Sequence, residues 1–203
     1  MSYGYIGDTS SSIKQQVKNA GVLSMSDVLD LESKGHLGGS LELIETQTFS
    51  GVSQVDFTSI KQNKYDVHFI SCTTTDVDNA LKVRLGNSGG IISSGYQLAN
   101  QFMITDGTFG EQKSTSSINF IDSGNSNSDS KNLYMYLYNA GNSSKYTFAT
   151  SQVFGSHTST AFIGYFGGAV RPTADEITQI RFYADTDLTG TIKLFGVKQI
   201  WVT

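Results

Sequence analysis

A chain of 203 residues is long enough to form one all-β domain around a single hydrophobic core. Its net charge of -4, with 16% charged residues, excludes a basic stripe, so we expect no nucleic-acid partner. Cys72 is the single cysteine and cannot close an internal disulfide. The chain shows neither an apolar run long enough for a bilayer nor a signal peptide, so we expect no membrane partner and synthesis in a cytoplasm.

The first part of the chain, residues 1–40, has helix-like patterning and is predicted to form an arm with two short helices. Ile13 and Val17 lie four residues apart in the first helix, and the second begins after Ser24 and ends at Gly35. Helices this short are marginal alone in water, so we expect their apolar stripes to pack on the rest of the protein or on another subunit. The residues that we expect at such an interface are Val17, Val22, Leu23, Val28 and Leu31.

From Leu41 the hydrophobic period changes to two, so residues 41–203 are predicted to form an all-β domain. Gly, Ser, Asn and Asp separate short alternating segments, which indicates about eight to ten strands. Because no helical pattern separates them, we predict a mainly β fold, an antiparallel β-sandwich or jelly roll, with a short N-terminal helical arm. Strands are expected from residue 41 onward and, after a turn at Ser50 and Gly51, from residue 55 onward. Further strands are expected over 65–69, 81–85, 118–121, 133–138, 146–150, 160–166, 177–184, 191–197 and 200–202, with a hairpin turn over 139–142.

The sequence Gly-Asn-Ser-Gly-Gly around Ser88 fits the G-x-S-x-G motif of serine hydrolases. Such an enzyme needs a histidine base and a carboxylate, and His36 or His68 with Asp56 or Asp66 are the available groups. Against this reading, His68 lies in the middle of a predicted strand and no helical pattern follows Ser88. A turn between two strands explains the same residues, so we predict no catalytic residue.

Alternating oxygen ligands occur at Asp76 and Asp78, at Asp185 and Asp187, and over residues 125–129. Calcium loops use such spacing, but the glycine and the bidentate glutamate of an EF-hand are missing, and turns at hairpin ends account for the pattern. The three histidines stand apart, and the chain has no P-loop. We therefore predict no metal site and no cofactor.

Residues 133–138, Leu-Tyr-Met-Tyr-Leu-Tyr, would place aliphatic side chains on one face of a strand and Tyr134, Tyr136 and Tyr138 on the other. Both faces then carry mainly apolar atoms, so we expect the tyrosine face to be packed against another part of the structure. The packing partner is a loop of the same chain, a second layer or another subunit. Tyrosine favours a subunit interface, because its ring can be buried while its hydroxyl group finds water or a partner. Stacking of these rings on a sugar is a further reading.

Several stretches resemble the jelly-roll modules of virion structural proteins from tailed bacteriophages. They are residues 39–49, 55–59, 65–69, 76–96 and 190–198, and residues 17–31 are similar to segments that precede β modules in phage tail and fibre proteins. The resemblance implies a non-enzymatic homo-oligomer, with a trimer favoured, that is fixed by one end to other virion proteins of a tail, neck or capsid.

The leading hypothesis is a bacteriophage virion structural protein, a short tail or neck fibre made in the host cytoplasm and anchored by its N-terminal arm. A capsid decoration protein is the first alternative. A carbohydrate-binding β-sandwich module, with a host surface glycan as ligand, is the next, and the serine hydrolase is the last.

Overall fold

The computed structural model describes residues 26, 29, 40–76, 80–123, 130–158 and 161–198. The chain divides into two units, Met1–Ser40 and Leu41–Thr203. In the first unit Ser26 and Leu29 are helical. All five interface residues expected in the arm lie outside the described residues: Val17, Val22, Leu23, Val28 and Leu31. The strand expected over 200–202 lies outside them too.

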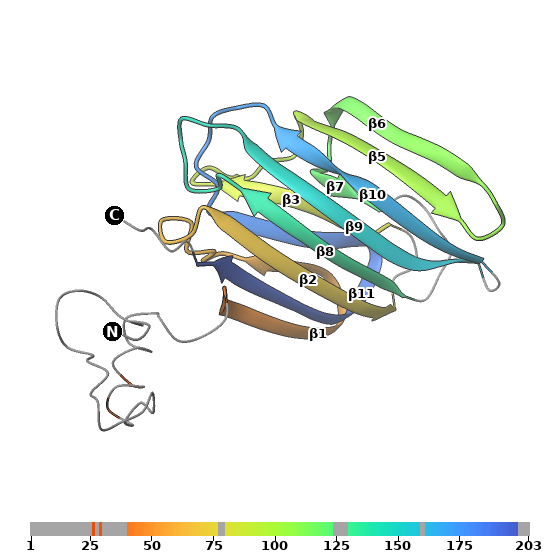
Figure 1. Ribbon diagram of the computed structural model, residues 1–203, viewed down its shortest axis with the longest axis horizontal. Helices are drawn as coiled ribbons and strands as arrows, with labels where there is room; N and C mark the ends of the chain where they lie inside the picture. The colour runs from red at the N-terminus through yellow and green to blue at the C-terminus, as the bar shows by residue number, and fades with distance from the viewer. Residues whose placement is uncertain are drawn as a thin grey trace, which may run out of the picture. The chain divides into compact units, whose positions relative to one another are not determined.

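The second unit is built from β-strands, which Figure 1 shows as one twisted sheet. Val, Ile, Phe, Tyr and Thr are frequent in these strands, since their branched or flat side chains suit a pleated surface. The strands are β1 (Leu41–Phe57), β2 (Val67–Asp76), β3 (Lys82–Asn87), β4 (Gly90–Ile91), β5 (Tyr96–Ile104), β6 (Phe109–Ser117), β7 (Ile121–Asp122), β8 (Lys131–Tyr138), β9 (Thr147–Thr158), β10 (Ala161–Arg171) and β11 (Gln179–Val197).

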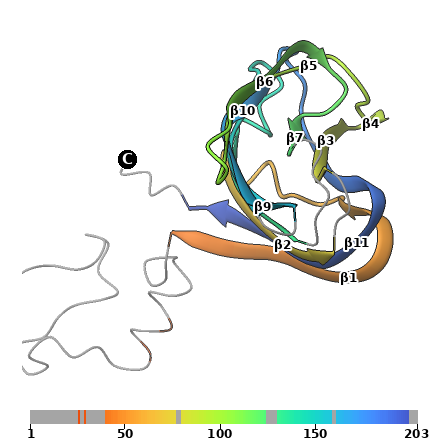
Figure 2. The ribbon, with the colours of Figure 1, turned by 90° about the vertical axis from the view of Figure 1, so that its right-hand side faces the viewer.

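All strand pairs are antiparallel, and the order along the sheet is β4-β3-β11-β2-β8-β9-β10-β5-β6, with β1 paired to β11 and β7 paired to β3. The sheet curls strongly around its interior (Figure 2). Tyr96 of β5 packs on Phe120 beside β7, with 5.5 Å between the ring centroids, so the two ends of the curl meet. The predicted mainly β, antiparallel fold is confirmed as a curled sheet.

Strands β1 and β11 are longer than the sequence predicted, because two expected turns are bends inside continuous strands. Gly51 has a φ of 63°, and the register of β1 against β11 shifts between Phe49 and Gln54. The acidic pair Asp185 and Asp187, expected at a hairpin end, lies within β11. Backbone pairing with a neighbour continues past each bend, so the turn-forming residues curve the ribbon without ending it.

Three further segments differ from the prediction. Strands β5 and β6 were not expected, although Tyr96 and Leu98 alternate with polar residues in β5. In β6 the residues are mostly polar, as suits a strand at the edge of the sheet. The strand expected over 118–121 is reduced to β7, because only Ile121 and Asp122 pair with β3.

The hydrophobic core fills the interior of the curl, where alternate residues of most strands point inward. Phe57 and Phe182 meet edge to face with 6.1 Å between their ring centroids. In β8, Met135 is 0% exposed and Leu137 is equally buried. The sheet therefore has one face that its own side chains fill and an opposite, outward face, and this outward face carries the candidate site.

Candidate functional site

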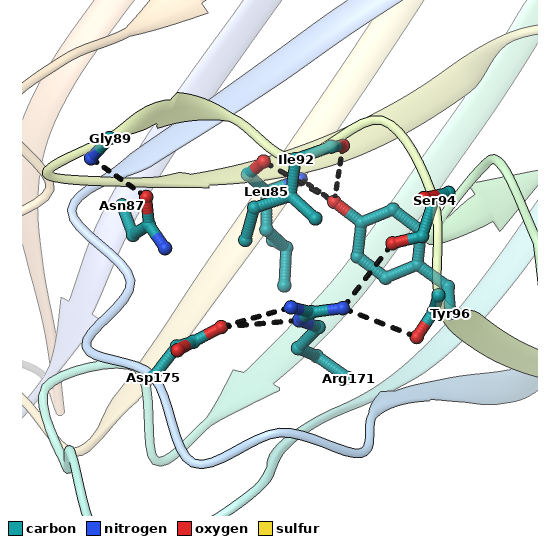
Figure 3. A network of polar contacts seen from close by, with 9 residues as sticks. Leu85, Asn87, Gly89, Ile92, Ser94, Tyr96, Arg171 and Asp175 are labelled. Atoms are coloured by element: carbon teal, nitrogen blue, oxygen red, sulfur yellow. Dashed lines mark hydrogen bonds and ion pairs between the residues drawn. The ribbon is translucent and has the colours of Figure 1, made fainter.

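The serine motif forms a hairpin turn between β3 and β4. Gly86 pairs with Ile91, and the Asn87 Oδ1 atom accepts a hydrogen bond of 2.8 Å from the Gly89 backbone N–H (Figure 3). Ser88 lies at the tip of this turn, directly after β3, and is exposed. The geometry is that of an Asx turn, in which the asparagine side chain closes the loop.

Two of the groups that a hydrolase could use, His68 and Asp56, are engaged elsewhere. His68 is buried in β2, and its Nε2 atom lies 2.8 Å from the Ile60 carbonyl oxygen. Asp56 binds the guanidinium of Arg181. His36 lies outside the described residues. Among the described residues, no histidine makes a hydrogen bond to Ser88, as a serine triad would require.

A polar network close to this turn holds the chain between β4 and β5 in place (Figure 3). Arg171 forms an ion pair of 3.1 Å with Asp175 and donates hydrogen bonds to the carbonyl oxygens of Ser94 and Gly95. The Tyr96 hydroxyl donates to the Ile92 carbonyl oxygen at 2.8 Å, and burial raises the pKa of Tyr96 to about 12. Since Tyr96 stays neutral and every partner is internal, we assign this network to stability.

The acidic pairs do not form a metal site in the described part of the chain. Asp185 binds the Lys82 ammonium at 2.5 Å. Among the described residues, no group of three or more His, Cys, Asp or Glu side chains could hold a metal ion. Asp78 and residues 125–129 lie outside the described residues.

The tyrosine face of β8 is open to solvent in the single chain. Tyr134 is 39% exposed and Tyr136 is 37% exposed, whereas their neighbours Met135 and Leu137 are fully buried. The Tyr134 hydroxyl donates to the Gln152 side chain on β9, and Tyr138 is half-buried. The predicted alternation along 133–138 is therefore present, with the tyrosines on the outward face.

Further aromatic side chains that sequence reasoning missed extend this face across neighbouring strands. The Phe69 ring of β2 lies 5.0 Å from Tyr136 and 5.9 Å from Phe195 of β11, measured between centroids. Tyr136 in turn stacks on Tyr138 at 6.4 Å. An apolar residue on the polar side of an alternating strand is the signal that could have found Phe69 and Phe195. We call these five side chains, Phe195, Phe69, Tyr136, Tyr138 and Tyr134, the aromatic face.

A groove borders the aromatic face where β9, β10, β5 and β6 follow one another in Figure 1. Its volume is about 810 Å³. Phe148, which pairs directly with Tyr138 across β9 and β8, forms one wall. Ala99 and Gly168, paired between β5 and β10, form the floor. We call this hollow the Phe148 groove.

Comparison with known proteins assigns no relative to this chain: no family model, no curated protein and no solved structure matches it. In the described residues, no helix is long and apolar enough to cross a membrane. Among the features of the chain itself, the aromatic face is the one that points most directly to a function.

Proposed function

We propose that this chain is a non-enzymatic structural protein of a bacteriophage virion that assembles as a homo-oligomer through its aromatic face. The observation that carries the proposal is the exposure of Tyr134 and Tyr136 beside Phe69 and Phe195 in a single chain. Monomeric proteins rarely leave a contiguous apolar patch of this kind uncovered. A second subunit would bury these rings while the tyrosine hydroxyls keep polar partners.

The chemistry of the face suits protein packing. Tyrosine and phenylalanine supply large contact areas and are enriched at interfaces, whereas charged residues are depleted there. The rings of the face already contact one another across β11, β2 and β8, so little side-chain freedom remains to be lost on association. The face is thus ordered before a partner arrives.

The virion assignment rests on the resemblance to phage jelly-roll modules in residues 39–198. In this proposal the curled sheet is a jelly-roll-like module, the N-terminal arm attaches the protein to other virion proteins, and the assembly is a trimer. A short tail or neck fibre is favoured over a capsid decoration protein, because an arm followed by a β module resembles the plan of fibre proteins.

The assembly is tested by the light-scattering mass of the purified chain over a range of concentrations. We expect the mass of a trimer for the wild type and a shift to the monomer for Tyr136→Arg, since an unpaired charge would be buried at the centre of the interface. Ser116→Arg on the edge strand β6 is the control and should leave the mass unchanged. A wild-type chain that stays monomeric at every concentration would overturn the proposal.

The place on the particle is tested by separating virions that contain the chain into tails and emptied capsids. Retention on the tails identifies a fibre, and retention on the capsids identifies a decoration protein. If the chain is recovered with neither fraction, the virion assignment is wrong.

A further inference from the structure

The hollow shape of the Phe148 groove follows from close packing of the backbone. A β-carbon on Gly168 would lie 2.4 Å from the Ala149 carbonyl oxygen, so this position of β10 accepts only glycine without a backbone shift. Ala99, its partner on β5, contributes only a methyl group. Two adjacent small residues in the middle of four paired strands leave a hollow that larger side chains surround.

The walls of the groove differ in chemistry. On the β9 side the Phe148 ring is 46% exposed and offers a flat apolar surface. On the β5 and β6 side the lining includes the polar residues Gln97, Lys113 and Thr115. Small-molecule sites usually combine an apolar surface with a few polar residues, and about 810 Å³ lies within their usual range of volumes.

The charge in the groove is balanced. The Lys113 ammonium forms an ion pair with Glu111, which lies on the same strand and face two residues away. A ligand at this wall therefore meets hydrogen-bonding groups and a cation that is already paired. An anionic ligand would consequently bind with little more affinity than a neutral one. The groove selects for a neutral molecule with one apolar face and several hydroxyl groups.

We propose that the Phe148 groove binds a neutral hexopyranose unit of a polysaccharide. The C–H face of the sugar ring packs on the Phe148 ring, and its hydroxyl groups reach the Gln97 amide and the Thr115 hydroxyl. This inference goes beyond the proposed role in assembly, and it moves the sugar site predicted at Tyr134 and Tyr136 to the neighbouring strands. Tyr138 of the aromatic face is the direct partner of Phe148 in the register of β8 and β9.

The occupant is a sugar and not a second aromatic face because of the polar wall. A subunit packed into the groove would bury the Gln97 amide and the Lys113–Glu111 ion pair against apolar rings, and removing such groups from water costs free energy. A polyhydroxylated ring satisfies both walls at once. The groove and the aromatic face are therefore separate surfaces with separate partners.

The test is native affinity electrophoresis of the full chain in gels that contain soluble dextran, mannan or galactan. We expect at least one of these polysaccharides to retard the wild type. Phe148→Ala should weaken the retardation about tenfold, since one ring contact of this kind is lost. Phe148→Tyr should retain it, and Ala99→Leu, which fills the floor, should abolish it. The matched control is Phe154→Ala, because Phe154 lies on the outward face of the same strand and is 44% exposed.

Three outcomes of the electrophoresis would overturn the inference: no retardation by any of the three polysaccharides, equal retardation of the wild type and Phe148→Ala, or equal weakening by Phe154→Ala. Light-scattering mass is measured on the same samples, which separates this inference from the assembly proposal. Weakened retardation of Phe148→Ala at unchanged mass supports the groove. A simultaneous fall in mass would also overturn it, because the ring would then act through subunit contacts.

Discussion

Asp56 and Arg181 form a two-pronged ion pair that joins β1 to β11. The guanidinium Nε and Nη2 atoms each lie 2.7 Å from one carboxylate oxygen of Asp56, and the two residues are direct partners in the strand register. The hydrogen bond to this carboxylate raises the pKa of Arg181, so the protonated guanidinium is stabilised. Both side chains are about a quarter exposed, which limits screening by water.

Replacing Asp56 with asparagine should lower the free energy of unfolding by about 1 kcal/mol, because a charge-assisted pair becomes a neutral hydrogen bond. Urea denaturation measures this change. Glu111→Gln is the matched control, since its ion pair with Lys113 is on a solvent-exposed edge strand, and it should not change the midpoint measurably. Equal effects of the two substitutions would contradict the role given to Asp56.

Adjacent residues of β8 should differ sharply in their effect on stability. Met135→Ala removes a fully buried side chain from the core and should cost about 2–5 kcal/mol of unfolding free energy. Tyr136→Ala removes a ring from the outward face and should cost less than about 1 kcal/mol in the monomer. Denaturation of both variants at low protein concentration checks the difference. A larger loss for Tyr136→Ala would mean that the tyrosine side belongs to the core.

His68 should make the fold sensitive to mild acid. Burial lowers the pKa of this imidazole below 6.5, and its hydrogen bond to the Ile60 carbonyl and the charge of Asp66 oppose that change only in part. The unfolded chain therefore binds the proton first, so the stability is fully present above pH 6.5 and decreases as the pH falls below it. Urea midpoints on either side of this pH measure the loss.

In His68→Gln the amide can still donate to the Ile60 carbonyl oxygen but does not titrate. The fall in urea midpoint across pH 6.5 should therefore be smaller than in the wild type. An unchanged pH dependence in this variant would assign the acid sensitivity to other groups.

Cys72 should be inert toward thiol reagents in the native protein. The side chain is buried in β2, and burial raises the pKa of the thiol to about 12, so the reactive thiolate is scarce. We expect no labelling by a chromogenic disulfide at mildly alkaline pH until urea unfolds the chain, and then one thiol per chain. Fast labelling of the folded protein would show that the inward face of β2 opens to solvent.

Local patterns were sufficient to predict the alternation of residues 133–138 and the turn that follows it. Strand β8 ends at Tyr138, Asn139 adopts a positive φ of 64°, and β9 pairs back onto β8. Period-two alternation determines which side chains share a face, and a short turn determines the next pairing. Both depend only on residues that are close in sequence.

The groove, the aromatic face and the long strands were decided by the tertiary structure. Phe148, Ala99 and Lys113 belong to three strands, and only the sheet order brings them to one hollow. Gly51 bends β1 instead of ending it because β11 continues the hydrogen-bonded pairing on both sides. The sequence by itself determined a mainly β, antiparallel chain with one face of tyrosines, since these follow from local periodicity. Which strands become neighbours depends on contacts between residues that are distant in sequence, and no local pattern encodes these contacts.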